Sequence, residues 1–153
     1  MGKKKTEKGA KHSVHVFVYG SLKQGLGNHG YLTALGGEFV GYDTISGPFS
    51  MVSLGGFPAT CVNGKVLCDP VYGQVFKISQ KALDALDALE GHPRWYRREK
   101  LRTDIQDVRA WIYLFPESEF AKFDKDRHVE GNMWRPSDEE KEFWEAKDVR
   151  FVA

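Results

Sequence analysis

Short segments rich in β-branched and aromatic residues, each ended by glycine, proline, asparagine or aspartate, fill much of the chain between residues 14 and 115. Such segments are typical of strands, because branched and aromatic side chains pack well on a pleated sheet. Asn63–Gly64 predicts a two-residue hairpin turn, and Gly73 predicts a close backbone approach or a bulge. We expect strands over Val14–Tyr19, Phe39–Ile45, Ser50–Leu54, Ala59–Val62, Lys65–Leu67, Val71–Ile78, Tyr96–Thr103 and Arg109–Phe115.

Helices are predicted at two further places. Ser79 is a plausible N-cap for an amphipathic helix that Gly91 and Pro93 end, and Ser137–Glu140 reads as a capping box opening a charged helix through about Lys147. A short helical or irregular piece follows the loop at residues 20–30 and ends at Gly36–Gly37. Together these elements predict an α+β fold: a small, curved, mixed β-barrel of six or seven strands with two or three flanking helices.

Length and composition fit one domain, residues 13–153, preceded by a basic tail at residues 1–12 that we expect to be disordered. The chain is 41% hydrophobic and 28% charged, which is ordinary for a soluble globular protein. A net charge of +1 gives no reason to expect nucleic acid or a membrane as partner. No apolar segment follows the lysines of the tail, so we do not interpret it as a secretory signal and expect a cytoplasmic protein.

Cys61 and Cys68 are the two cysteines, and they flank the Asn63–Gly64 turn. They could face each other across a hairpin, but nothing indicates an oxidising compartment, and we expect two reduced thiols. No set of Cys, His and Asp residues has zinc-ligand spacing, so we expect no metal.

Glu90 is the residue that departs most from its local pattern. Ala82, Leu83, Leu86 and Leu89 recur at helical steps and form an apolar stripe, and Glu90 stacks over Leu83 and Leu86 at its edge. Asp84 and Asp87 fall outside the stripe and read as solvated charges. A carboxyl directed toward a core is costly, so such a residue is usually retained for chemistry. The alternative is a side chain that swings into water at the last helical turn beside Gly91.

Several other patterns do not carry the function they superficially match. Gly25–Gly30 fits G-x-G-x-x-G, but it begins five residues after Gly20 and no long helix follows, so it does not predict a dinucleotide site. Ser21 lacks the frame of a serine nucleophile and has only His29 nearby. Asp84, Asp87 and Glu90 rotate around their helix, and no second acidic cluster completes a divalent-metal site.

The segment Val16–Leu22 is a strand that runs into Tyr-Gly-Ser-Leu. A turn that glycine permits presents several backbone N–H groups, which can hold a carboxylate or a developing oxyanion. The plain structural alternative is a tight turn whose hydroxyl satisfies its own backbone.

At this point the chain resembles the γ-glutamyl cyclotransferase-like superfamily, over roughly Val14 to Phe115. Its Leu-Lys-x-Gly-x-x-Asn-His run is most similar to the γ-glutamylamine cyclotransferase branch. No counterpart is evident for the chain beyond Phe115. The segments that carry the resemblance, in the family's order, are Val18–Leu22, Lys23–Gly25, Asn28–His29, Gly56–Ala59, Val71–Val75, Leu86–Glu90 and Tyr96–Arg98.

The resemblance implies a compact β-barrel with its cavity at one mouth. It implies that Tyr19, Gly20, Ser21 and Leu22 bind the γ-glutamyl group largely through backbone N–H donors, and that Glu90 is the catalytic glutamate. The implied reaction is an intramolecular aminolysis that releases 5-oxoproline and a free amine or amino acid from a small γ-glutamyl substrate. Pro58 and Tyr96, with Tyr19, would shape the pocket. No cofactor is implied.

Two other functions stay open on the same fold. The cavity could bind a small metabolite without catalysis, or the enzyme could remove a γ-glutamyl cap from a biosynthetic intermediate. The sequence does not reveal the leaving amine or the oligomeric state. We expect the far wall of the pocket to come from Met133–Trp134 or from the Gly25–Gly30 loop.

Overall fold

The computed structural model describes residues 13–62, 69–92, 94–116 and 127–147. The basic tail, the Asn63–Gly64 turn, the strand expected at residues 65–67, Cys68 and Pro93 lie outside these residues. The described strands are β1 (Ser13–Val18), β2 (Glu38–Ile45), β3 (Phe49–Ser53), β4 (Pro58–Val62), β5 (Val71–Ser79), β6 (Arg97–Arg102) and β7 (Arg109–Leu114). The described helices are α2 (His29–Ala34), α3 (Gln80–Glu90), α5 (Asp138–Ala146) and the 3-10 turn η2 (Glu130–Asn132).

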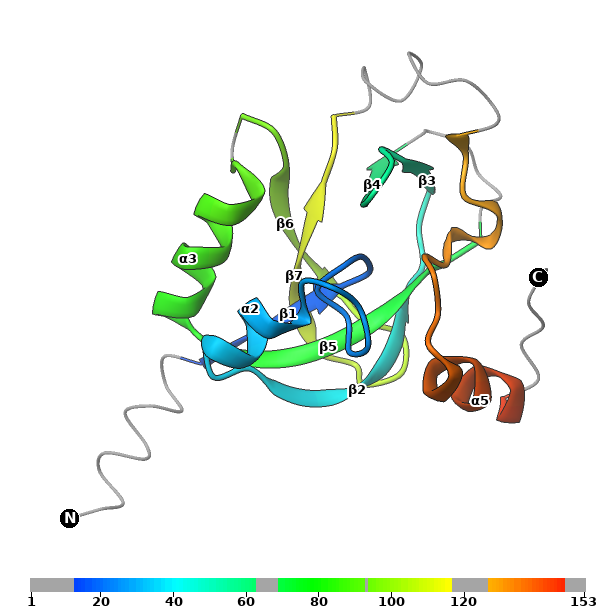
Figure 1. The fold of residues 1–153 in the computed structure, drawn as a ribbon, viewed down its shortest axis with the longest axis horizontal. Coiled ribbons are helices and arrows are strands. Elements are labelled where there is room, and N and C mark those ends of the chain that lie inside the picture. The colour runs from blue at the N-terminus through cyan, green and yellow to red at the C-terminus, as the bar shows by residue number, and fades with distance from the viewer. Residues whose placement is uncertain (1–12, 63–68, 93, 117–126, 148–153) are drawn as a thin grey trace.

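The main sheet is mixed and has β1 at its centre, with the strand order β2-β5-β1-β7-β6. β1 pairs antiparallel with β5 and parallel with β7, so Val16 lies between Phe76 and Trp111. The edge strand β6 carries three arginines, a glutamate and a lysine, a composition that discourages pairing with another sheet. Figure 1 shows this sheet curving between α3 on one side and α5 on the other.

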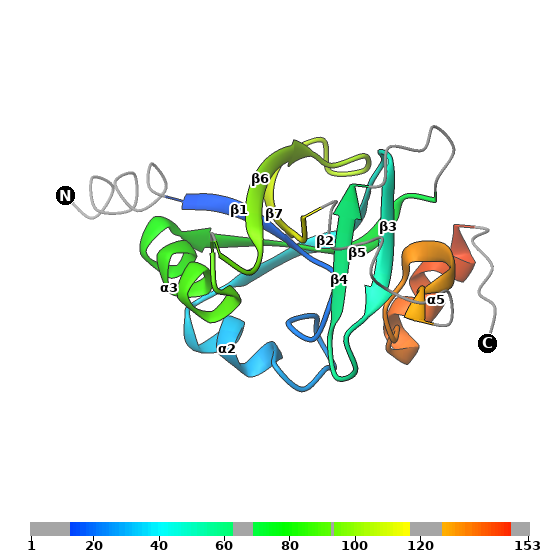
Figure 2. The same ribbon diagram turned by 90° about the horizontal axis from the view of Figure 1, so that it is seen from above.

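The predicted β-barrel is wrong in one respect, because the described strands do not close. β3 and β4 form a separate two-stranded sheet, which stands beside the main sheet in Figure 2. Isolated bridges join Cys61 to Phe115 and Val52 to His128. Strand number alone does not produce closure, which also needs a continuous hydrogen-bond register around the sheet. The fold is therefore α+β with a curved, open, mixed sheet.

Alternating side chains of β1 feed two hydrophobic cores. Val16 and Val18 pack with Leu83 and Leu86 of α3, whereas Phe17 faces the opposite side of the sheet. Gly73 of β5 confirms the predicted close approach, since a Cβ atom there would collide with the Val18 carbonyl oxygen and the Phe17 ring. Cys61 is fully buried on β4.

Both predicted helix N-caps are confirmed. The Ser79 hydroxyl accepts a hydrogen bond from the Ala82 N–H at 3.1 Å, and Ser137 accepts from the Glu140 N–H at 3.2 Å. The capping box at Ser137 is only half formed, because the Glu140 carboxylate does not return to its own helix end. It accepts instead from the Lys23 ammonium at 2.7 Å and from the Trp144 indole at 3.3 Å.

The Lys23–Glu140 ion pair fastens α5 to the loop that follows β1. Both side chains are about 1% exposed, and the Lys23 ammonium also donates to the Trp134 carbonyl. Burial lowers the pKa of Lys23, and the adjacent Glu140 opposes that shift. The pair explains why α5 lies against the body, with Trp144 2% exposed and its ring 4.9 Å from that of Tyr72.

Candidate active site

A cavity of about 210 Å³ opens where the end of β1, the start of β4 and the last turn of α3 meet. All seven predicted site residues line it, although they come from three separate parts of the chain. The lining consists of Phe17, Val18, Tyr19, Gly20, Ser21, Leu22, Asn28, Phe57, Pro58, Leu89, Glu90, Trp95, Tyr96 and Tyr113.

Glu90 is the last residue of α3, and it lines the cavity. Gly91 ends the helix in the left-handed region at φ +68°, and the Glu90 carbonyl accepts from the Tyr96 N–H at 3.4 Å. No described residue donates a hydrogen bond to the Glu90 carboxyl group. Burial raises its pKa from 4.5 to about 7, because a charge in apolar surroundings loses hydration. The carboxyl is thus able to accept and release a proton near neutral pH.

The turn after β1 lies in the same cavity and offers backbone donors. The Lys23 N–H donates to the Gly20 carbonyl at 3.0 Å and closes the turn. The N–H groups of Ser21 and Leu22 meet no acceptor among the described residues. Gly20 is required for packing, since a Cβ atom there would lie 2.8 Å from the Pro58 ring. Unpaired N–H groups beside a cavity can bind an anion.

The Ser21 hydroxyl is engaged within its own loop. It accepts from the Asn28 amide at 2.8 Å, and the Asn28 N–H donates to the Ser21 carbonyl at 2.9 Å. The imidazole of His29, the nearest candidate base in sequence, lies 2.9 Å from the Leu22 carbonyl oxygen through Nδ1. This arrangement does not favour Ser21 as an activated nucleophile.

Tyrosine hydroxyls hold the cavity walls together. The Tyr19 hydroxyl donates to the Tyr113 carbonyl at 2.6 Å and accepts from the Thr60 N–H at 3.2 Å. The Tyr96 hydroxyl donates to the Pro58 carbonyl at 2.8 Å. Burial, reinforced by the nearby Glu90 carboxyl, raises the pKa of both phenols well above the usual value. Both therefore stay protonated and shape the pocket.

Asp87 corrects one expectation from the sequence. It is not a solvated charge: its side chain is 18% exposed and its Oδ1 accepts from Arg98 Nε at 2.8 Å and from the Tyr113 hydroxyl at 2.7 Å. Arg98 in turn stacks on Trp111. Tyr113 lines the cavity, and burial with the Asp87 hydrogen bond raises its pKa. The sequence held one signal that Asp87 lies near the site: it is three residues from Glu90, and residues at that spacing are neighbours on a helix.

Of the two predictions for the far wall of the cavity, Met133–Trp134 is wrong, and the Gly25–Gly30 loop is confirmed only in part. Trp134 is buried in the core at 5% exposure, and of the Gly25–Gly30 loop only Asn28 is a lining residue. Leu89 was expected to face the core, but it is 47% exposed. Leu89 lines the cavity together with Phe57 and Trp95.

Two properties of the described residues bear on metal binding and on membrane insertion. Within the described ranges, no group of three or more His, Cys, Asp or Glu side chains could hold a metal ion. In the same part of the chain, no helix has the length and apolar character needed to cross a membrane.

Comparison with known proteins gives the family. Residues 16–136 match the family model described as "Gamma-glutamyl cyclotransferase, AIG2-like". The chain belongs to this family. A protein of Methanocaldococcus jannaschii, MJ1514, named provisionally as a γ-glutamylcyclotransferase, is 36% identical over 109 residues, which are 68% of this chain and 86% of the relative. Gamma-glutamylaminecyclotransferase C of Danio rerio is 34% identical over 100 residues, 60% of this chain and 62% of the relative.

Two solved structures share the architecture. An AIG2-like protein from Mus musculus superposes with a TM-score of 0.60 at 23% identity, covering 83% of this chain and 98% of the mouse chain. The uncharacterized protein PH0828 from Pyrococcus horikoshii also gives 0.60 at 20% identity, with 78% and 88% covered. These likenesses show the fold.

Proposed function

We propose that this protein is a γ-glutamyl cyclotransferase that releases 5-oxoproline and a free amine from a small γ-glutamyl compound. One observation carries the proposal: a half-buried carboxyl with no described hydrogen-bond donor and a turn with unpaired N–H groups line the same cavity. Family membership supports the same reaction. The proposal extends to a single domain over residues 13–153 and to a cytoplasmic location.

The reaction requires a proton to leave the substrate before its nitrogen can attack. In the proposed mechanism the Glu90 carboxylate takes a proton from the α-ammonium of the glutamyl group. The freed amine attacks the γ-amide carbonyl carbon, so a new C–N bond closes the five-membered ring. Because burial holds the pKa of Glu90 at about 7, the same carboxyl group can accept this proton and pass it on.

The second half of the reaction expels the leaving amine. The carbonyl oxygen gains negative charge in the tetrahedral intermediate, and the N–H groups of Ser21 and Leu22 are placed on the turn that lines this cavity. Donors of this kind are commonly worth about 3 kcal/mol each in a transition state. The leaving nitrogen takes the proton from Glu90 as its bond to the carbon breaks. The ring nitrogen then gives its second proton to the Glu90 carboxylate, and the released amine carries that proton away as an ammonium. No water, metal or redox cofactor enters this balance.

Substrate folding is the remaining requirement, because a flexible glutamyl chain must bring its amine to its own carbonyl. Pro58, Tyr19 and Tyr96 form rigid walls whose positions are set by the hydrogen bonds described above. Holding reactants in a near-attack shape can contribute several orders of magnitude in rate. These walls would favour the folded conformer.

The test is direct detection of the products. Purified protein is incubated with γ-glutamyl amino acids and γ-glutamylamines, and 5-oxoproline and the released amine are quantified by mass spectrometry. We expect Glu90→Gln to lower kcat at least about 100-fold, the usual scale for a lost general base. Asp84→Asn, on an exposed position of the same helix, serves as the matched control and should stay within about twofold.

The outcomes separate the alternatives. The wild-type kcat/KM should rise with pH through about 7 as Glu90 ionises. Equal turnover by wild type and Glu90→Gln would remove Glu90 as the base. Tight binding of a γ-glutamyl compound with no 5-oxoproline formed would favour a non-catalytic binding protein. Activity confined to one unusual leaving amine would favour removal of a γ-glutamyl cap in biosynthesis.

A further inference from the structure

The opening of the cavity is formed by three exposed apolar side chains from different segments. Phe57, Leu89 and Trp95 are 39%, 47% and 59% exposed, and all three line the same cavity as Glu90. Phe57 lies between β3 and β4, Leu89 lies in the last turn of α3, and Trp95 precedes β6. Single exposed apolar side chains are ordinary, but several around one opening mark a binding surface. We call these three residues the apolar rim.

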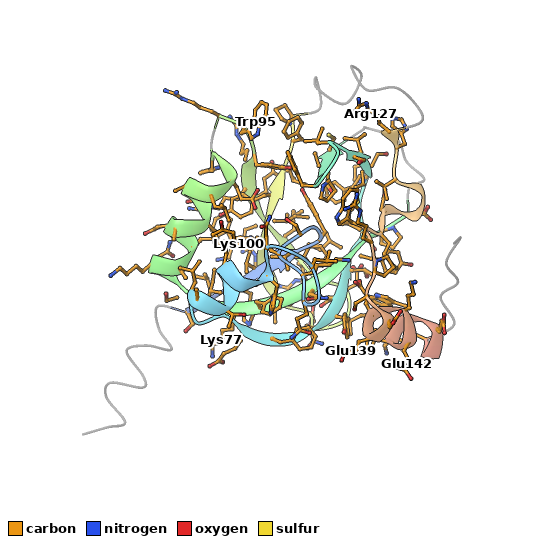
Figure 3. All side chains as sticks on the ribbon, in the orientation of Figure 1. Lys77, Trp95, Lys100, Arg127, Glu139 and Glu142 are labelled. Atoms are coloured by element: carbon orange, nitrogen blue, oxygen red, sulfur yellow. The ribbon has the colours of Figure 1, made fainter. Side chains whose placement is uncertain are left out.

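Trp95 is held in place although more than half of its surface is exposed. The backbone N–H of Trp95 donates to the Gly91 carbonyl at 2.8 Å. The Trp95 ring packs edge-on against the Phe115 ring, with 5.6 Å between the ring centroids. Gly91 allows close packing, since a Cβ atom there would lie 2.9 Å from Trp95 Cβ. Figure 3 shows Trp95 beyond the end of α3. Because the Trp95 ring is already fixed, a ligand that binds against it loses little free energy in ordering this side chain.

The charges around the cavity limit what can lie against this rim. Its described lining residues include no lysine, arginine or histidine, and Glu90 is the one carboxylic acid among them. The backbone donors of the turn are engaged by the glutamyl part in the proposed reaction. A second carboxylate, on the leaving group, would therefore find no cation among the described lining residues and would lie near Glu90. Placing an unpaired charge against apolar side chains is unfavourable.

We propose that the leaving group is an apolar aliphatic or aromatic amine without a carboxylate, whose hydrocarbon part packs on Phe57, Leu89 and Trp95. This inference rests on the proposed cyclotransferase function and narrows its substrate class to γ-glutamylamines of apolar amines. Arg94, which is exposed and adjacent to Trp95 but does not line the cavity, is the nearest alternative partner for a carboxylated leaving group.

The test uses substrates that differ in one feature at a time. γ-Glutamylphenethylamide and γ-glutamylphenylalanine differ only by the carboxylate on the leaving group, and γ-glutamylmethylamide lacks the hydrocarbon. We expect kcat/KM for the phenethylamide to exceed that for each of the other two by at least about tenfold, the usual discrimination of an apolar subsite. Equal values for the phenethylamide and phenylalanine compounds would overturn the inference.

Variants assign the preference to the rim. Trp95→Ala and Leu89→Ala should each lower the ratio of phenethylamide to methylamide kcat/KM at least about threefold. Ile105→Ala is the matched control, because Ile105 is 43% exposed in the β6–β7 connection and does not line the cavity; it should leave the ratio unchanged. A drop in γ-glutamylphenylalanine turnover on Arg94→Gln would instead assign the subsite to a carboxylate and overturn the inference.

A binding measurement separates failure of this inference from failure of the proposed function. If none of the three compounds yields 5-oxoproline, the proposed function fails. Calorimetric titration of wild-type protein with the same compounds then decides the inference. Tighter binding of the phenethylamide than of the phenylalanine compound supports an apolar subsite, and equal or reversed affinity overturns it.

Discussion

Two carboxyl groups turned toward the interior show how differently single residues serve this chain. Asp43 is fully buried and accepts hydrogen bonds from three backbone N–H groups: Thr44 at 2.7 Å, Ile105 at 2.8 Å and Gln106 at 2.9 Å. Glu90 has no donor among the described residues. Buried acids are normally satisfied by hydrogen bonds. An unsatisfied acid that lines a cavity is therefore the one to associate with chemistry.

The raised pKa of Glu90 makes stability depend on pH in a defined direction. Below pH 4.5 the group is protonated in both folded and unfolded chains, and above about 7 it is charged in both. Between these values only the folded chain keeps the proton, so the wild type loses stability as pH rises. At pH 8 the free energy of unfolding of Glu90→Gln should exceed that of the wild type by about 3 kcal/mol. At pH 4 the two proteins should unfold at the same urea concentration. Reversal of that order would contradict the raised pKa.

Substitution of Asp43 should lower the stability of the fold rather than raise it. Asp43→Asn replaces one acceptor oxygen with a donor, so at least one backbone N–H loses its partner in the interior. We expect a loss of about 2 kcal/mol in the free energy of unfolding with little change in kcat, as read by urea denaturation and product assay. Asp84→Asn is the exposed comparison, and its stability should match wild type. A stable Asp43→Asn protein would mean that water replaces the lost acceptor.

At the scale of elements, the attachment of α5 is the feature that sequence patterns describe least well. A capping box predicts that the glutamate three residues after Ser137 returns to the helix end. Glu140 instead crosses to Lys23, more than a hundred positions away, because a buried ammonium needs a charged partner more than a half-buried backbone N–H does. Helix position and N-cap are local properties, whereas this choice of partner is not.

The Lys23–Glu140 pair should be strongly coupled. Glu140→Gln leaves the buried ammonium without its counter-charge, and we expect a loss of about 3–5 kcal/mol in unfolding free energy. The double variant Lys23→Met with Glu140→Leu should recover much of that loss, because an apolar pair needs no compensation. Urea denaturation of both single variants and the double variant measures the coupling. The side chains of Glu139 and Glu142 point outward from α5 in Figure 3, so Glu139→Gln and Glu142→Gln are the controls.

At the scale of the whole molecule, the sequence predicts the elements better than their assembly. The seven described strands and both capped helices fall within about two residues of their expected ends, because periodicity, capping residues and turn residues are local signals. Pairing is not local. The β1–β7 parallel pair and the separate β3–β4 sheet depend on which strands meet, and strand propensities carry no such information.

The site shows the same division. Glu90 stood out in the sequence because it breaks an apolar stripe, and the family resemblance supplied the turn at Tyr19–Leu22. The apolar rim and Tyr113 were not predicted as site residues. Phe57, Trp95 and Tyr113 look like core aromatics, and only the arrangement of the β3–β4 connection, the segment between α3 and β6, and β7 around one cavity brings them together.

The tyrosine hydroxyls around the cavity have a chemical consequence. Tyr19, Tyr96 and Tyr113 are committed as struts between neighbouring segments and keep their hydrogens at neutral pH. Of the side chains described there, Glu90 alone exchanges a hydrogen ion in that range. The cavity can thus hold one exchangeable hydrogen ion at a time, and Glu90 must release each hydrogen ion that it accepts before the next catalytic cycle begins. Turnover should leave the acidity of an unbuffered solution unchanged, apart from the ordinary ionisation of the released products.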